Sequence, residues 1–382
     1  MKDIIKCLKQ GGVLFIFLCI SLILNHRFGY ITLIGIFCIL TFVLVSIKTK
    51  IEKGDIVILS YLIFYTLFSY INGVSYSLST LVLYAFAPFF FYQYGKKIPQ
   101  IYNNEKGIIN TWLIIILCYC IDIFIITITN YLETGELFNE NRLFFFSESD
   151  DSLLNATLVG LPMGIGMIGL PMYFITKNKI LKFLFLSLSL LSIITTLSLL
   201  NRTGLVVLSI CFLVVIGYKY RRNITMLLFV FLIVVIAITV LMNTGVISLE
   251  LIEAYEERNI NISTAGDRTT RWMEAIIKVF TNPLGWTDGK TYYVHNMWLD
   301  IARISGIIPF LLLLYMAYDC FKKAFQIIRR FNNSFSYMLL GLNVCFFLTC
   351  FVEPIYGGTH FMLYCMLWGT ERELFINKCL LS

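Results

Sequence analysis

Apolar stretches long enough to cross a lipid bilayer recur along almost the whole chain, and they constrain its fold more than any other feature. Each is roughly 18 residues or longer, the length typical of a membrane-spanning helix. Of 382 residues, 58% are hydrophobic and only 14% are charged, whereas an ordinary soluble domain has about 25% charged residues. We therefore expect an all-α integral membrane protein, with residues 1–382 forming a single polytopic domain.

The pattern predicts about twelve membrane spans, and an even number places both termini on the same side of the membrane. The first apolar run follows Lys2, Lys6 and Lys9 and has no convincing signal-peptidase site, so we interpret it as a retained span. The predicted spans are 12–26, 31–47, 55–73, 78–94, 108–132, 153–175, 180–200, 203–219, 224–245, 296–319, 335–353 and 359–371.

Lysine and arginine residues are divided unequally between the two sets of span ends. One set holds 21 of the 30 basic residues, and the opposite set holds nine. Because the side richer in basic residues is the cytoplasmic one, we expect an N-in, C-in topology and a large extracytoplasmic loop over residues 246–295. This signal accounts for most of the +7 net charge, so nothing points to a nucleic-acid partner.

The eleven cysteines do not fall in the long outer loops. Cys118 and Cys120 are two residues apart inside a predicted span, where they do not face each other. A disulfide framework or a zinc site is therefore not expected. These side chains are typical of small hydrophobic residues in a helix bundle.

The outer loop at 246–295 is unusually long for a chain of tight turns, and such loops usually have a function. Within it, residues 268–280 have helical spacing, and Pro283 ends the predicted helix. One face carries the apolar residues Trp272, Ile276, Val279 and Phe280. We expect a short amphipathic helix at the membrane surface. Because the loop has more acidic than basic residues, an anion site there would depend on particular arginines.

Three arginines on the outer side are candidates for such a site. Arg202 lies in a very short turn between two spans, where a charge usually faces a cavity or a partner. Its guanidinium could grip a phosphate, or it could extend to the lipid headgroups. Arg268 and Arg271 are three residues apart at a helix start and could converge on one anion. The alternative is a solvated helix start with Asp267 as its N-cap.

His295 stands at the mouth of a predicted span, where an imidazole can accept a proton near neutral pH. A lone histidine is more often structural, and the residues alone leave both interpretations open. Asp300 and Arg303 follow on the same span and could be a buried ion pair that supports a site, or could merely stabilise each other. Arg142, in the outer loop at 133–152, is a further candidate that could equally be solvated.

Three sequence elements occur in a characteristic order. They are Asn201-Arg-Thr-Gly204; Gly266-Asp-Arg268 with Trp272 and Asn282-Pro-Leu-Gly285; and His295-Asn-Met-Trp-Leu299 followed by Ile304-Ser-Gly306. Together they resemble elements of the O-antigen polymerase and O-antigen ligase superfamily. The resemblance covers about a third of the chain, and the amino-terminal half is similar only in hydropathy.

The resemblance implies a glycosyltransferase with a GT-C-like membrane bundle that needs no metal or other cofactor. It implies undecaprenyl-diphosphate-linked glycans as donor and acceptor in the bacterial inner membrane, a site facing the periplasm, and a chain-length regulator and a flippase as partners. By position, Arg202 and Arg268 would bind the diphosphate, and His295 would activate or orient the acceptor hydroxyl. The residues expected to contact substrate are Arg271, Arg142, Asn296, Arg303 and Trp272, of which Trp272 could instead belong to an interfacial aromatic belt.

The polymerase and the ligase differ in the acceptor, which is another lipid-linked repeat unit for the polymerase and lipid A–core for the ligase. The residues of Asn282-Pro-Leu-Gly285 and His295-Asn-Met-Trp-Leu299 favour a polymerase. A twelve-span transporter, such as a flippase of lipid-linked oligosaccharide, is the alternative from another class. It would be expected to carry charges within its spans and to have short loops on both sides. The long outer loop and the clean apolar runs favour an enzyme.

Overall fold

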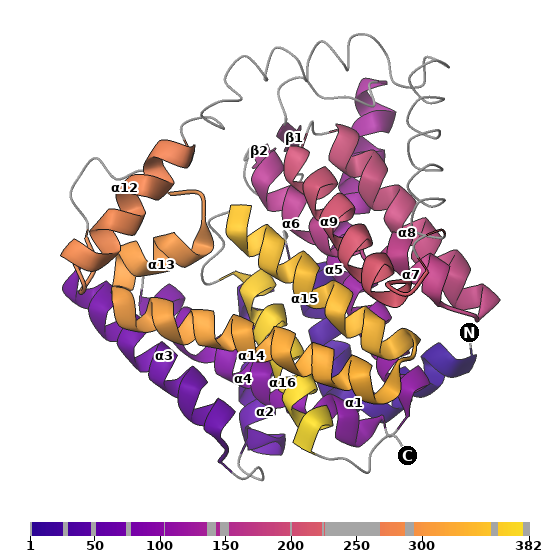
Figure 1. Ribbon diagram of the computed structural model, residues 1–382, viewed down its shortest axis with the longest axis horizontal. Coiled ribbons are helices and arrows are strands. Elements are labelled where there is room, and N and C mark those ends of the chain that lie inside the picture. Colours follow the sequence, from indigo (N-terminus) through magenta and orange to yellow (C-terminus); the bar gives the residue numbers. More distant parts are fainter. Residues whose placement is uncertain are drawn as a thin grey trace. The chain divides into compact units, whose positions relative to one another are not determined.

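The computed structural model describes residues 2–25, 30–46, 51–73, 78–102, 104–135, 143–145, 153–198, 201–223, 225, 268–286, 294–352 and 358–376. The chain divides into two compact units. The first comprises Met1–Asp122 and Thr270–Ser382, and the second comprises Ile123–Thr269. Each unit is described by itself, with the element labels of Figure 1.

The first unit is helical throughout its described residues. Its helices are α1 (Lys2–Ile23), α2 (Tyr30–Leu44), α3 (Lys53–Ile71), α4 (Leu78–Ile101), the first part of α5 (Glu105–Thr134), α12 (Arg268–Thr281, whose first two residues belong to the second unit), α13 (Met297–Ser305), α14 (Ile307–Phe331), α15 (Ser334–Val352) and α16 (Thr359–Ile376).

Helices α4 and α16 pack closely along their length in the first unit. A Cβ at Gly95 would lie under 3.0 Å from the Met366 carbonyl group, and one at Gly369 would lie equally close to the Tyr92 carbonyl. Small residues on both helices thus allow their backbones to approach, as at other helix contacts in membranes. Two large buried aromatic side chains meet at this contact, Tyr92 of α4 and Trp368 of α16, whose ring centroids are 4.8 Å apart.

The second unit contains the rest of α5, then β1 (Leu143–Phe145), β2 (Leu153–Asn155), α6 (Ala156–Gly166), α7 (Gly169–Ile175), α8 (Lys179–Ser198) and α9 (Arg202–Lys219). The two strands form an antiparallel ribbon in which Leu143 pairs with Asn155. Helices α6 and α7 pack against α8 through small residues, since a Cβ at Gly166 would meet the Ser192 side chain and one at Gly169 would meet the Phe185 carbonyl oxygen. Glycines thus permit the close packing of these helices.

Four of the described helices are long and apolar enough to cross a membrane: Lys53–Ile71, Glu105–Glu133, Lys179–Ser198 and Ser334–Phe351. Shorter apolar helices occur at Gly12–Ile23, Thr32–Leu44, Gly160–Ile175 and Thr203–Lys219. The chain is thus an all-α membrane protein apart from the short β ribbon. The twelve-span count and the topology remain predictions, and the predicted span 224–245 lies almost wholly outside the described residues.

Two predicted spans are interrupted. The span predicted at 296–319 is two helices, α13 and α14, which meet at Gly306. The glycine has a φ of 81°, a left-handed conformation that ends α13. The span predicted at 153–175 is likewise divided into α6 and α7 by a turn at Met167 and Ile168. Apolar composition continues through both breaks, so hydropathy alone could not locate them.

The described cysteines are all free, and every one except Cys118 is buried. Their environment confirms the prediction that these residues serve as small hydrophobic side chains in the helix bundle.

Candidate functional site

His295 has an unusual backbone conformation for its residue type. Its φ is 56°, and among the described residues only Asn332 shares a positive φ without being glycine. Residues other than glycine are uncommon in this left-handed region, because Cβ approaches the following carbonyl oxygen, although asparagine, aspartate and histidine occur there more often than the rest. His295 is half-buried, while Val294 and Asn296 on either side are buried. The surrounding contacts must therefore stabilise this conformation.

Two hydrogen bonds hold the residue that precedes His295. The Val294 N–H donates to Asp300 Oδ1 at 3.1 Å. The Val294 carbonyl oxygen accepts from the indole Nε1–H of Trp272 at 2.9 Å. The first partner belongs to α13 and the second to α12, so both helices fix the loop.

Asn296 directly follows His295 and caps the start of α13. Its Oδ1 accepts from the Leu299 N–H at 3.2 Å, which is an N-cap. Four residues later, the buried Asp300 forms an ion pair with Arg303, whose Nε lies 3.1 Å from Asp300 Oδ1. The predicted buried pair is therefore present.

The charges of this pair lie in α13, which has nine residues and is too short to cross a bilayer. Asp300 is completely buried, and the guanidinium of Arg303 supplies the opposite charge beside it. The loop that carries His295 is thus hydrogen-bonded to a carboxylate that is shielded from water.

A backbone junction joins α12 to the start of α14. The Trp286 N–H donates to the Arg303 carbonyl at 2.8 Å, and the Ile307 N–H donates to the Pro283 carbonyl at 2.9 Å. Gly285 and Gly306 have φ values of 103° and 81° where the two segments meet. A Cβ at Gly285 would lie 2.7 Å from the Arg303 carbonyl oxygen. The glycines of the Asn-Pro-Leu-Gly and Ile-Ser-Gly elements therefore serve this junction.

Asn72, just after α3, connects a third helix to the same place. Its Nδ2 donates to the Leu284 carbonyl at 2.7 Å and to the Ile304 carbonyl at 2.9 Å. One amide group thus binds both segments of the junction, a role that no motif around Asn72 predicts.

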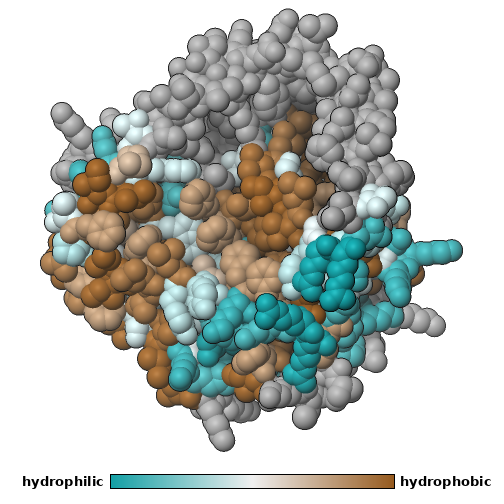
Figure 2. All heavy atoms as spheres, viewed as in Figure 1, coloured by the Kyte–Doolittle hydropathy of each residue, from teal (hydrophilic) through white to brown (hydrophobic). Residues whose placement is uncertain are grey.

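Helix α12 confirms the predicted amphipathic helix, and its apolar side chains lie along one broad side. Ala275 and Val279 pack against Leu299 and Ala302 of α13. Other large apolar side chains of α12 are exposed: Met273, Ile276, Ile277 and Phe280. Figure 2 shows apolar surface in the region of α12. Part of the apolar face therefore packs on the protein, and the adjoining part is exposed.

The first turn of α12 carries the predicted pair of arginines. Arg268 is the first residue of α12, and Arg271 is half-buried one turn later. Trp272 follows, and its ring packs edge-on against Phe351 with centroids 5.1 Å apart. The turn predicted to bind the diphosphate is therefore contiguous with the residue that holds the His295 loop.

Arg202 is the first residue of α9 in the second unit. Asn201 caps this helix, because its Oδ1 accepts from the N–H groups of Thr203 and Gly204. Arg202 and His295 belong to different units. That the two side chains face one substrate site remains a prediction. Arg142 lies outside the described residues.

Three of the residues predicted to contact substrate make contacts within the protein. Trp272 bonds to Val294, Asn296 caps α13, and Arg303 pairs with Asp300. Whether these side chains also touch a substrate remains a prediction.

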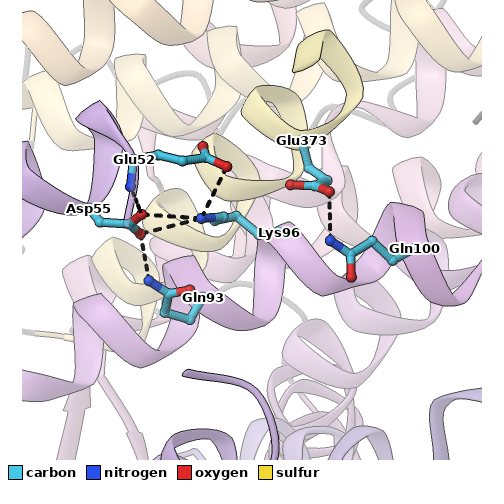
Figure 3. A network of polar contacts seen from close by, with 6 residues as sticks. All are labelled: Glu52, Asp55, Gln93, Lys96, Gln100 and Glu373. Carbon is cyan, nitrogen blue, oxygen red and sulfur yellow. Dashed lines mark hydrogen bonds and ion pairs between the residues drawn. The ribbon is translucent and has the colours of Figure 1, made fainter. Parts of the chain in front are cut away.

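A network of buried charges lies where α3 meets α4, and its residues were not among the predicted site residues. The Lys96 Nζ lies 3.2 Å from Asp55 Oδ2 and 3.6 Å from Glu52 Oε1 (Figure 3). The Gln93 amide also donates to Asp55. Lys96 and Asp55 are only 2% exposed, so both charges lie inside the helix packing.

Helices α14 and α16 share a second buried cluster, centred on Asp319. Asp319 Oδ2 accepts from Trp368 Nε1 and Arg372 Nη1, both at 2.8 Å, and Oδ1 pairs with Lys323. Glu371, next to Arg372 in the chain, is fully buried. The sequence feature that could have indicated this cluster is the charged residues at the ends of the apolar runs. Because α14 and α16 continue past those runs, the charges lie within the helix packing.

His360 is a structural histidine. It lies in α16 and is 1% exposed. Its Nε2 is hydrogen-bonded to Thr349 Oγ1 at 2.6 Å, and its Nδ1 to Tyr119 Oη at 3.4 Å. His360 thus fits the usual structural role of a lone histidine, whereas His295 lies in a strained loop.

Among the described residues, no group of three or more His, Cys, Asp or Glu side chains is arranged to hold a metal ion. No protein-family model matches the chain, and no curated protein is similar to it.

Proposed function

We propose that this chain is a metal-independent glycosyltransferase that joins undecaprenyl-diphosphate-linked oligosaccharide repeat units on the outer face of the bacterial inner membrane, as an O-antigen polymerase does. The observation that carries the proposal is the backbone of His295, with its φ of 56°. Glycine or asparagine would adopt this conformation at a lower cost. A histidine held there by two helices indicates that its ring is needed, and strained residues of this kind cluster at active sites.

In the proposed reaction, an acceptor hydroxyl oxygen attacks the anomeric carbon of the donor. The bond between that carbon and the diphosphate oxygen breaks, and undecaprenyl diphosphate leaves with the electron pair. The His295 ring accepts the hydroxyl proton. Arg202 and Arg268 stabilise the charge that develops on the diphosphate, and Arg271 is a further residue that could contact it.

The buried ion pairs bear on the alternative of a flippase. A flippase was expected to carry charges within its spans, and Asp55, Lys96 and Asp319 are indeed inside the helix packing. Each of them is paired with an opposite charge across a helix contact or along one helix. Such pairing stabilises helix packing, so these charges do not favour a flippase over an enzyme.

Deletion of the gene in its host, followed by electrophoresis of lipopolysaccharide and of lipid-linked glycans, separates the candidate functions. A polymerase mutant should carry core with a single repeat unit. A ligase mutant should carry bare core and accumulate lipid-linked polymer. A flippase mutant should carry bare core and accumulate single lipid-linked units, and either of the last two profiles would reject the proposal.

Site variants then test the residues in the deletion background. His295→Asn keeps a residue that tolerates a positive φ but cannot accept the proton, so it should abolish long chains at a normal protein level. Arg202→Ala and Arg268→Ala should do the same. Arg329→Ala, which removes an exposed arginine at the end of α14, is the matched control. A wild-type ladder from all three site variants would exclude this assignment.

A further inference from the structure

We propose that Trp272 and Asp300 are positioning residues that fix the backbone of His295 and thereby the direction of its ring. Their effect on the reaction rests on the proposed function, whereas their effect on His295 does not. The two hydrogen bonds involved will be called the Val294 clamp: Trp272 Nε1 to the Val294 carbonyl at 2.9 Å, and the Val294 N–H to Asp300 Oδ1 at 3.1 Å.

The clamp acts on the peptide that enters His295. The carbonyl that Trp272 holds belongs to the peptide bond between Val294 and His295, so it limits rotation immediately before the histidine. The N–H that Asp300 holds fixes the other side of Val294. Because Val294 is 4% exposed, water does not readily replace either bond, and a left-handed residue needs such constraints from its neighbours.

Each partner in the clamp is itself fixed. Trp272 packs against Phe351 of α15 with ring centroids 5.1 Å apart. Asp300 is completely buried, and the Arg303 Nε binds the same Oδ1 that accepts from Val294. The clamp is therefore preorganised, as a supporting shell of a functional site must be.

The clamp also links the two parts of the proposed reaction. Trp272 directly follows Arg271 and lies in the first turns of α12, whose first residue is Arg268. The arginines proposed to bind the diphosphate and the indole that holds Val294 therefore belong to the same turns of one helix.

The test compares two tryptophans that differ in this bond. Trp272→Phe removes the indole N–H of the clamp and keeps an aromatic ring. Trp298→Phe is the matched control, because the Trp298 indole is 3% exposed and its Nε1 has no hydrogen-bond partner among the described residues. The purified full-length protein is treated with diethyl pyrocarbonate, and mass spectrometry of peptides reports the modification rate of His295 separately from His26 and His360.

Trp272→Phe should change the modification rate of His295 at least about three-fold, and should lower kcat for lipid-linked repeat units roughly ten-fold with KM little changed, as expected for one lost hydrogen bond. Trp298→Phe should leave all three values near wild type. Equal modification rates in the two variants would overturn the positioning role. A changed modification rate with an unchanged kcat would uphold the positioning role and reject the catalytic role of His295.

Asp300 is tested by a pair of variants. Asp300→Asn keeps an oxygen that can accept from the Val294 N–H, whereas Asp300→Leu does not. The leucine variant should shift the modification of His295 and the asparagine variant much less, with circular dichroism and gel filtration in detergent confirming that both are folded. Equal shifts in two folded variants would show that the charge of Asp300 matters rather than the clamp. If the leucine variant does not fold, a wild-type modification rate in Asp300→Asn supports the clamp and a shifted rate overturns it.

Discussion

Replacement of Lys96 by methionine should reveal how strongly one buried ion pair stabilises the first unit. Lys96 lies in α4 with its side chain 3% exposed, and its Nζ is 3.2 Å from Asp55 Oδ2 (Figure 3). Methionine has a similar length and volume but no charge, so the packing around the side chain changes little. The main consequence is that the Asp55 carboxylate loses its closest cation.

The size of the effect follows from what remains around Asp55. The carboxylate is 2% exposed and keeps two donors, the Gln93 amide at 2.5 Å and the Glu52 backbone N–H at 2.6 Å. Removing one partner of a buried ion pair costs about 3–5 kcal/mol. Because these two donors still stabilise the negative charge, we expect a loss of about 3 kcal/mol in the free energy of unfolding.

Asp55→Asn should relieve part of that loss. The double variant no longer carries an isolated buried charge, so it should be about 2 kcal/mol more stable than the sum of the single variants predicts. The free energy of unfolding is measured by titrating the protein in dodecylmaltoside with sodium dodecyl sulfate while following tryptophan fluorescence.

Lys97→Met is the control for Lys96→Met. Lys97 is the next residue of the same helix, is half-buried, and hydrogen-bonds to Gln100 at 2.8 Å. Its replacement should change the free energy of unfolding by no more than about 0.5 kcal/mol. Equal stability of the two lysine variants would show that the ion pair between Lys96 and Asp55 does not stabilise the protein. The same conclusion would follow if Asp55→Asn simply added its own loss of stability to that of Lys96→Met.

Two glycine substitutions can be measured with the same titration. Gly306→Ala places a Cβ under 3.0 Å from the Pro283 carbonyl at a φ of 81°, so it should cost about 2–4 kcal/mol and also lower glycan polymerisation. Wild-type stability would mean that the junction of α12 and α14 is looser than described. Gly169→Ala would place its Cβ against the Phe185 carbonyl, whereas a Cβ at Gly217 would have no atom within 4 Å. The first should destabilise the protein by about 1–3 kcal/mol and Gly217→Ala should be neutral or slightly stabilising; equal effects would contradict the packing of α7 on α8.

The positions of most helices could be predicted from the sequence because long apolar runs must form hydrogen-bonded helices in a membrane. Every predicted span within the described residues overlaps a helix. The amphipathic helix at 268–280 was also predictable, since helical spacing and Pro283 give local signals. The break at Gly306 was not, because it depends on the approach of Pro283 from another segment.

The candidate site could be predicted only in part, for the same reason. His295 was identifiable as a histidine at a span mouth, but its left-handed backbone depends on the bond from Trp272, 22 residues before Val294. The pairing of Asp55 with Lys96 spans 41 residues and two helices. Residue spacing within one helix carries no information on such contacts, so it could not reveal the buried charge network.

Only part of the apolar face of α12 is buried. Ala275 and Val279 pack on α13, so the helix cannot rotate to bury the remaining apolar side chains without losing this contact. Met273, Ile277 and Phe280 remain 59–72% exposed, and burying each would contribute about 1.5–3 kcal/mol. Asn72, which follows the last residue of the membrane-crossing helix α3, donates to Leu284 just beyond α12. If α3 crosses the membrane, we expect the exposed side chains of α12 to lie where α3 leaves the apolar layer.

This position suits the proposed reaction. At the boundary of the bilayer, the exposed apolar side chains of α12 would contact lipid chains, while its first turn carries Arg268 and Arg271 and Trp272 holds the His295 loop. A polyprenyl-linked donor has the same division, with its hydrocarbon tail in the membrane, its diphosphate at the boundary and its sugars outside. We therefore expect α12 to set the height of the reacting groups, because one rigid helix contacts the lipid and holds His295 through Trp272.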